Sequence, residues 1–312
     1  MNKLNNLLGV SVLALASLST TAAEIGVVTW DPYASSDFNL SYDFQQWFQT
    51  SSGDSSWADV SGGVSDGNIL TGRGEVYSIN NDFGFACAGC ELTIEFGGLE
   101  IDIVAHGDVN YGADLAAANA WLAFPQNTGS LTFDGTDFII TGAETTSFLT
   151  GSSYWTLFSD ISADFDEGTL SGMTTQAAVD AELAAATDGD IWLSGTFGAM
   201  ALTSGALNGT GTVEYIMNIE AGMAYGSFAQ DGTFFPPLSI FVDSWGNGDA
   251  NVLANDATTI FTTPGDPTSG VIFATFAGDG SLNADSIPEP TSIALFGLSL
   301  LGLAGAARRK QS

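Results

Sequence analysis

The sequence predicts an all-β body, built as a single β-sandwich or jelly roll with one short helix. Three observations lead to this prediction: the 312 residues include 38 glycines, only five residues are Lys or Arg, and apolar and polar residues alternate along many short runs. A hydrophobic content of 45%, with 21 phenylalanines, is enough to fill a sizeable core. The body is expected to cover residues 24–276.

Two hairpins and several further strands are expected in this body, because alternating runs are separated by residues that favour turns. The first hairpin is predicted to turn at Gly97-Gly98, between the runs 92–96 and 99–104. The second is predicted to turn at Asp134-Gly135, where glycine tolerates the positive φ of a tight turn. Further strands are expected at 191–197, 212–219, 238–242 and 271–276.

One segment has helical rather than alternating spacing. Within residues 174–186, Val179, Leu183 and Ala186 fall on one face of a helix. Hydroxyl residues that can cap a helix precede this run, and Gly189 follows it. We expect a short helix whose apolar face packs on the strands.

The charge distribution excludes one class of partner. The net charge is -31, and 36 residues are acidic. The basic residues are Lys3, Arg73, Arg308, Arg309 and Lys310, so the body itself contains Arg73 alone. Nucleic-acid affinity depends on Lys and Arg contacts to phosphate, and we therefore expect no nucleic-acid partner.

The N-terminus has the three parts of a secretory signal peptide. Lys3 is followed by an apolar run over residues 7–18 and then by small residues up to Ala23. The apolar run is too short to span a membrane comfortably. We expect signal peptidase to remove residues 1–23, so that the mature chain begins near Glu24.

The C-terminus also has three parts. Pro288, Glu289 and Pro290 form an extended strip, since two prolines exclude a helix. Residues 293–307 carry no charge and would form a helix of about 22 Å, which can lodge in the inner membrane. The basic end, Arg308 to Lys310, is expected to stay cytoplasmic, which places the body outside the membrane.

This tail, residues 288–312, resembles the PEP-CTERM sorting domain. The resemblance implies recognition by an exosortase, removal of the tail near the Pro-Glu-Pro motif, and delivery to the cell surface or extracellular matrix. Proteins with this tail are often linked to exopolysaccharide and biofilm production. Residues 277–287 are expected to form a flexible leader into the tail. The alternative is a permanent single-span anchor.

The two cysteines, Cys87 and Cys90, lie three residues apart in a chain bound for an oxidising compartment. A local disulfide that pins a turn is the expected arrangement. A thioredoxin-like redox pair would need a βαβ setting, and a zinc site would need more ligands than the lone His106 supplies.

Two clusters of oxygen-bearing side chains could bind Ca²⁺, although neither matches an EF-hand loop. The first contains Asp160, Asp164 and Asp166, and the second contains Asp243, Asn247 and Asp249. The alternative for both is a solvated turn. No other cofactor is indicated.

We find no catalytic motif in the body and expect a non-enzymatic protein. His106 precedes Gly107-Asp108, but no serine lies in a nucleophile elbow and no second histidine is present. The alternative is a secreted polysaccharide-active hydrolase that uses a pair of carboxylates, since such chemistry needs only two acids across a sugar.

Aromatic residues near the start of the body suggest the role we favour. They lie among Asp, Gln and Ser, and exposed aromatic faces can stack on sugar rings. They are Trp30, Tyr33, Phe44, Trp47, Phe48 and Trp57. The alternative is that they pack in the core. The expected function is adhesion or association with extracellular polysaccharide at the cell surface or in the matrix.

Overall fold

A computed structural model describes residues 23–31, 38–50, 57–58, 64–170, 173–205, 211–228, 245–248 and 276–284. Strands predominate among these residues, which confirms the all-β class. The strands are β1 (Ala23–Ile25), β2 (Val28–Trp30), β3 (Phe38–Gln49), β4 (Ile69–Ile79), β5 (Glu91–Asn110), β6 (Asn127–Phe133), β7 (Phe138–Leu149), β8 (Tyr154–Asp160), β9 (Asp190–Gly205), β10 (Gly211–Ala221), β11 (Trp245–Gly248) and β12 (Phe276–Ala284). The helices are α2 (Leu115–Leu122), α3 (Glu167–Leu170), α4 (Gln176–Ala185) and the 3-10 turn η1 (Tyr225–Ser227).

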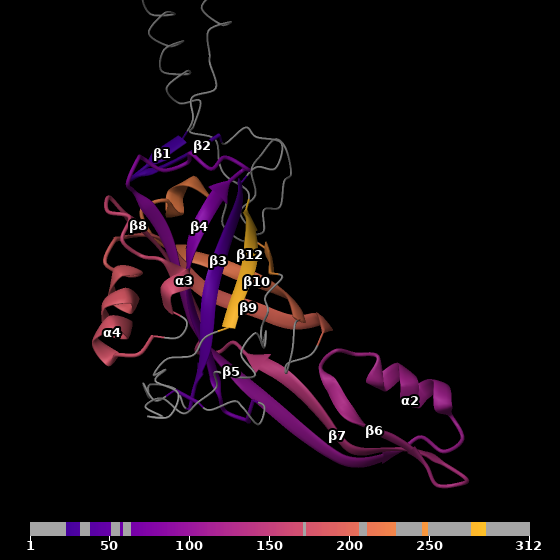
Figure 1. Ribbon diagram of the computed structural model, residues 1–312. Coiled ribbons are helices and arrows are strands. Elements are labelled where there is room, and N and C mark those ends of the chain that lie inside the picture. The colour runs from indigo at the N-terminus through magenta and orange to yellow at the C-terminus, as the bar shows by residue number, and fades with distance from the viewer. Residues whose placement is uncertain are drawn as a thin grey trace, which may run out of the picture.

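Eight antiparallel strands close into a barrel. Their order is β4-β3-β12-β11-β10-β9-β8-β5, and β5 pairs with β4 to complete the ring. Figure 1 shows β9 and β10 passing behind β3 and β4. The two layers expected for a sandwich are therefore opposite walls of one continuous sheet. Closure pairs the edges that an open sheet would expose.

The main core fills the inside of this barrel. Alternate residues of β3, beginning with Phe38 and Leu40, point inward and are fully buried. The largest buried side chains are Trp155 and Trp192, each with no exposed surface. Trp192 lies 5.7 Å from Trp30 between ring centroids, in an edge-to-face arrangement. The hairpin β1–β2, which carries Trp30, thus packs over one end of the barrel.

Strand β5 is one continuous strand of 20 residues, so the hairpin predicted at Gly97-Gly98 is wrong. Its first part, Glu91 to Gly97, pairs with β8 in the barrel, and its second part, from Glu100 onward, pairs with β7. The pairing with β4 shifts register between these parts. Gly98 has a φ of +68° there, and its Cα faces the backbone of Ser152. The glycine pair therefore forms a bulge that bends the strand.

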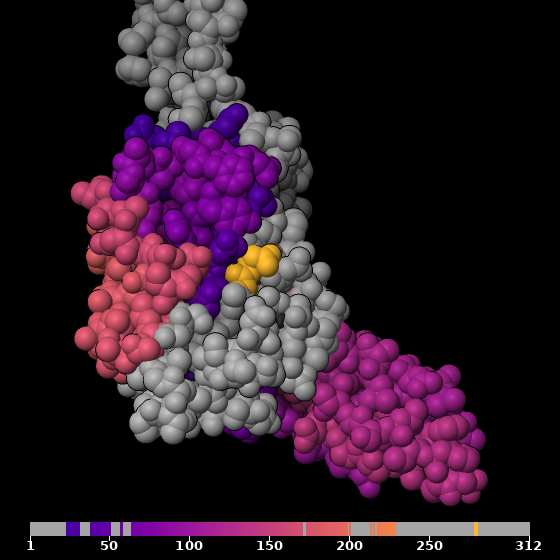
Figure 2. All heavy atoms as spheres, viewed as in Figure 1, coloured from indigo at the N-terminus to yellow at the C-terminus, as the bar shows by residue number. Residues whose placement is uncertain are grey.

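Beyond this bulge the chain forms an arm, which we define as residues 102–147. The end of β5, together with β7, β6 and α2, makes a small sheet with its own apolar cluster around Ala118, Ile140 and Ala143. The predicted turn at Asp134-Gly135 is confirmed, since Phe133 pairs with Phe138 across it. Figures 1 and 2 show the arm standing clear of the barrel.

The single helix predicted at 174–186 is confirmed as α4, whose N-cap Thr175 accepts a hydrogen bond from the N–H of Ala178. Helices α2 and α3 were not expected. Helix α2 begins after Asp114, which accepts a hydrogen bond from the N–H of Ala117, and its sequence is rich in alanine. Helices α3 and α4 pack on the outer face of the barrel, against Trp47.

The segment expected to be a flexible leader, residues 277–287, instead supplies most of β12. This strand pairs with β3 from Phe276 to Ala284, and Gly278 lies opposite Phe44, whose ring fills the space that a Cβ at Gly278 would need. The strands predicted at 191–197 and 212–219 are confirmed within β9 and β10. The strand predicted at 238–242, most of the one at 271–276, and both terminal segments lie outside the described residues.

The residues that pair with β3 show what lies at each end of the barrel. Phe38 pairs with Ala284, the last described residue, whereas Gln49 pairs with Ile69, which in turn pairs with Glu100 near the base of the arm. At about 3.3 Å per residue, β3 spans about 36 Å between these points. Ala284 therefore lies at the end of the barrel opposite the arm.

Candidate functional site

The outer face of the barrel under α3 and α4 is lined by charged and polar residues. Glu91, Thr93 and Glu95 of β5 point to this face, while Leu92, Ile94 and Phe96 between them fill the core. Glu95 forms an ion pair with Arg73 of the neighbouring strand. Arg73 also donates a hydrogen bond to the carbonyl of Leu183 in α4, which ties the helix to the sheet.

Glu91 has no such basic partner among the described residues. Its cross-strand neighbour in β8 is another acid, Asp160. Together with Asp164 of the following loop, these residues place three carboxylate oxygens within 4.8 Å of one another. We call Glu91, Asp160 and Asp164 the carboxylate cluster. Like charges opposite each other on a sheet repel, so this arrangement costs free energy unless something neutralises it.

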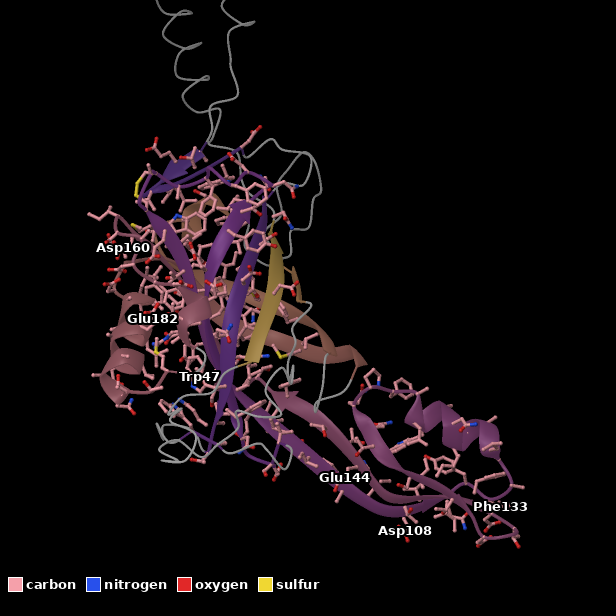
Figure 3. All side chains as sticks on the ribbon, in the orientation of Figure 1. Trp47, Asp108, Phe133, Glu144, Asp160 and Glu182 are labelled. Carbon is pink, nitrogen blue, oxygen red and sulfur yellow. A yellow bond between two sulfur atoms is a disulfide. The ribbon has the colours of Figure 1, made fainter. Side chains whose placement is uncertain are left out.

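Burial makes Glu91 the unusual member of the carboxylate cluster. It is 3% exposed. Its Oε2 accepts a hydrogen bond of 3.3 Å from the N–H of Phe165, but its buried Oε1 has no hydrogen-bond partner among the described residues. Asp160 is half-buried and Asp164 is exposed, so the cluster reaches the surface on one side. Figure 3 shows Asp160 at the edge of the barrel, beyond the end of α4 that carries Glu182.

The loop that carries Asp164 is held by two sets of contacts. The N–H of Ser162 donates a 3.0 Å hydrogen bond to Asp160 Oδ1. The N–H of Ala163 donates a 2.8 Å hydrogen bond to the carbonyl of Gly89. Gly89 lies in the turn between Cys87 and Cys90, whose sulfur atoms are bonded to each other. The disulfide turn thus braces both the loop and the start of β5.

The protonation behaviour of the carboxylate cluster follows from its burial. Desolvation raises the pKa of Glu91 to about 7, and the charges of Asp164 and Glu75 add to the rise, while N–H groups of Phe165 and Asp164 oppose it. A fourth acid, Asp188, lies nearby in the loop after α4. The pKa of Asp188 is raised, mainly by a hydrogen bond to Asp160 and secondly by desolvation. Four acids therefore share one small region.

Of the six residues expected to bind calcium, the structure brings two together. Asp166 lies apart from the carboxylate cluster, because its Oδ1 accepts a hydrogen bond from the N–H of Gly168 and so caps α3. Asn247 lies in β11, opposite Glu214. Asp243 and Asp249 lie outside the described residues. Glu91 was not predicted as a calcium ligand. In the sequence it is one polar residue of an alternating run, and that run gives no sign that helices cover the polar face of β5.

His106 lies in the arm, where its Nε2 is 2.9 Å from Thr145 Oγ1 and its ring meets Trp121 edge-on. The described aromatic residues of the predicted sugar-binding strip are mostly buried: Trp30, Phe44, Trp47 and Phe48 are each at most 4% exposed. Trp57 is partly buried against Trp47, and Tyr33 lies outside the described residues. The most exposed aromatic side chains described are instead Phe83, Phe133 and Phe124.

The sorting residues Pro288 to Pro290 and Arg308 to Lys310 lie outside the described residues. Among the helices that the structure describes, none has the length and apolar character needed to cross a membrane. Comparison of the chain with curated proteins and with solved structures finds no match. Residues 286–310 do match the family model of the PEP-CTERM protein-sorting motif. The chain therefore ends in a PEP-CTERM motif, which indicates an exosortase-sorted protein that is exported across the membrane to the cell surface or extracellular space.

Proposed function

We propose that the mature protein is a non-enzymatic component of the cell surface or extracellular matrix that associates with exopolysaccharide, or mediates adhesion in a biofilm, through its arm. The observation that carries the proposal is that the C-terminal strand ends at one end of the barrel and the arm leaves from the opposite end. Ala284, two residues before the sorting motif, lies at one end of β3, and the arm leaves from the other end. A mature chain attached through the C-terminus that remains after sorting would present the arm outward.

The surface of the arm supports contact with sugars. Phe133 and Phe124 are 57% and 56% exposed. The rings of Phe133 and Phe138 lie 4.8 Å apart beside the turn that ends the hairpin. Polar groups flank them, including Asp137, which accepts a 2.8 Å hydrogen bond from Asn110. Exposed rings beside hydrogen-bonding groups suit sugar faces and hydroxyls, and the arm ends far from the barrel (Figure 3).

The geometry of the carboxylate cluster argues against the hydrolase alternative. Retaining glycosidases hold their two carboxyl groups about 5–5.5 Å apart, and inverting enzymes hold them farther apart, with the sugar between them. The oxygens of the cluster lie within 4.8 Å, and Glu91 is buried beneath the loop after β8. A sugar ring does not fit between groups placed in this way.

A truncation of the arm tests the proposal. Asp102 and Ser147 are cross-strand partners at its base, so joining them through Asn-Gly would close a two-residue hairpin and leave the barrel intact. We expect this variant to lose more than about tenfold in affinity for polysaccharide extracted from the producing cells, measured by co-sedimentation.

A single substitution, Phe133→Ser, should weaken the same binding. Phe83→Ser is the matched control, since Phe83 is 76% exposed but lies on the barrel, stacked on Tyr77. Unchanged binding by a folded, arm-truncated protein would refute the assignment of the arm.

A further inference from the structure

The carboxylate cluster contains a buried carboxylate oxygen that has no hydrogen-bond partner among the described residues. Glu91 is 3% exposed, and its Oε1 is buried without a hydrogen-bond partner among the described residues. Burying a carboxylate oxygen in this way is costly unless an opposite charge or a donor meets it. The neighbouring side chains, Asp160 and Asp164, are acids as well and cannot donate when ionised.

The basic side chain nearest in the sheet is committed elsewhere. Arg73 binds Glu95 and the carbonyl of Leu183. The unsatisfied oxygen and its two acidic neighbours therefore call for an external cation. We propose that Glu91, Asp160 and Asp164 bind one Ca²⁺ ion at the junction of β5, β8 and the loop after β8.

The spacing of the ligands fits calcium. Ca²⁺ binds oxygen at about 2.3–2.6 Å, so two ligands on opposite sides of the ion lie about 4.6–5.2 Å apart. The three oxygens of the cluster lie within 4.8 Å of one another, so one Ca²⁺ ion can reach all three. Mg²⁺ demands near-octahedral geometry at about 2.0–2.1 Å and gives up its bound waters reluctantly, so a site with a buried ligand such as Glu91 favours Ca²⁺.

The supporting structure suits a site that forms after export. Asp164 is held near Glu91 by the hydrogen bond from Ala163 to Gly89, in the turn closed by the disulfide. Disulfide formation and Ca²⁺ binding by extracellular modules, with Kd of about 10⁻⁴–10⁻³ M, both belong outside the cell. The site goes beyond the proposed function and does not depend on it.

Calorimetric titration of the purified, oxidised full chain with CaCl₂ tests the proposal, at about 0.15 M salt to screen diffuse binding to surface acids. We expect one site with a Kd below about 1 mM and a rise in melting temperature with Ca²⁺ that Mg²⁺ does not reproduce. Glu91→Gln and Asp164→Asn should each weaken binding by more than about tenfold, since even outer-shell changes have such effects.

Two controls separate this site from diffuse binding. Asp166→Asn removes a neighbouring acid outside the carboxylate cluster, and Glu144→Gln removes an exposed acid from the arm; both should leave the Kd unchanged. In EDTA, Glu91→Gln should melt no lower than the unmodified protein, because it removes an uncompensated buried charge. Equal Ca²⁺ affinity in the unmodified protein and Glu91→Gln, or equal stabilisation by Mg²⁺, would overturn the proposal.

Discussion

The bulge in β5 allows a sharply controlled test of how the arm is joined to the barrel. Gly98 and Gly107 lie in the same strand and have nearly the same backbone angle, with φ of +68° and +69°. A Cβ added at Gly98 would lie 2.1 Å from the carbonyl oxygen of Ser152, whereas at Gly107 it would meet nothing within 4 Å. An alanine at either position would therefore be strained by the left-handed backbone, but only at Gly98 would it also clash with the backbone of Ser152.

The expected magnitudes follow from these two effects. Placing alanine in the left-handed region costs about 1 kcal/mol at either position. At Gly98 the clash with Ser152 cannot be relieved by a side-chain movement and adds about 2 kcal/mol, as in other overpacked sites. Because about 1 kcal/mol shifts the melting temperature of a chain of this size by about 2–4 °C, Gly98→Ala should lower it by about 6–12 °C.

Thermal and urea unfolding of Gly98→Ala and Gly107→Ala measures the difference directly. The Gly107→Ala variant should lose about 2–4 °C. Equal losses in the two variants would show that Gly98 is not closely approached by Ser152, and that the bulge does not form the junction described.

Two further predictions concern charges on the outer face of the barrel. Burial raises the pKa of Glu91 to about 7 and also raises the pKa of Glu75. Between pH 7 and pH 5 the folded protein therefore binds protons that the unfolded chain does not. In EDTA the free energy of unfolding should increase by about 1 kcal/mol for each pH unit as the pH falls from 7 toward 5. Urea titrations should show this slope reduced in Glu91→Gln, and an equal slope in both proteins would contradict it. Arg73→Met should cost about 3 kcal/mol because it leaves Glu95 and the carbonyl of Leu183 unpaired, and adding Glu95→Met should recover part of the loss. A double variant less stable than the single one would contradict this reading.

Local patterns in the sequence predicted the fold where one physical effect dominated. The turn at Asp134-Gly135 is flanked by alternating residues on both sides and formed as expected. The run that became α4 combined a capping hydroxyl with helical spacing. The Gly97-Gly98 pair was ambiguous, because a bulge and a turn use the same residues. The apolar positions shift from even numbers at Phe96 to odd numbers at Leu99, and this change of phase is the mark of a bulge.

Other features depend on contacts between distant segments and could not be read from local patterns. The residues of β12 resemble a linker in composition and become a strand because β3 offers them a partner. Ring closure depends on the pairing of β4 with β5. For the carboxylate cluster, Asp160 and Asp164 were visible as a local run of acids, but Glu91 is 69 residues away from Asp160 in sequence and joins them only through the register of β5 and β8.

The central claim is that the PEP-CTERM tail directs the barrel and its arm to the outside of the cell. The most direct test is the intact mass of the protein recovered from its producing cells, in membrane, surface-washed and medium fractions, for the unmodified chain and for a variant with Pro288, Glu289 and Pro290 replaced by alanine. We expect a surface or medium species that begins near Glu24 and ends near Pro288, and we expect the variant to be retained with Arg308 to Lys310 still attached. A cytoplasmic protein of full mass, or an identical distribution of both proteins, would contradict the account.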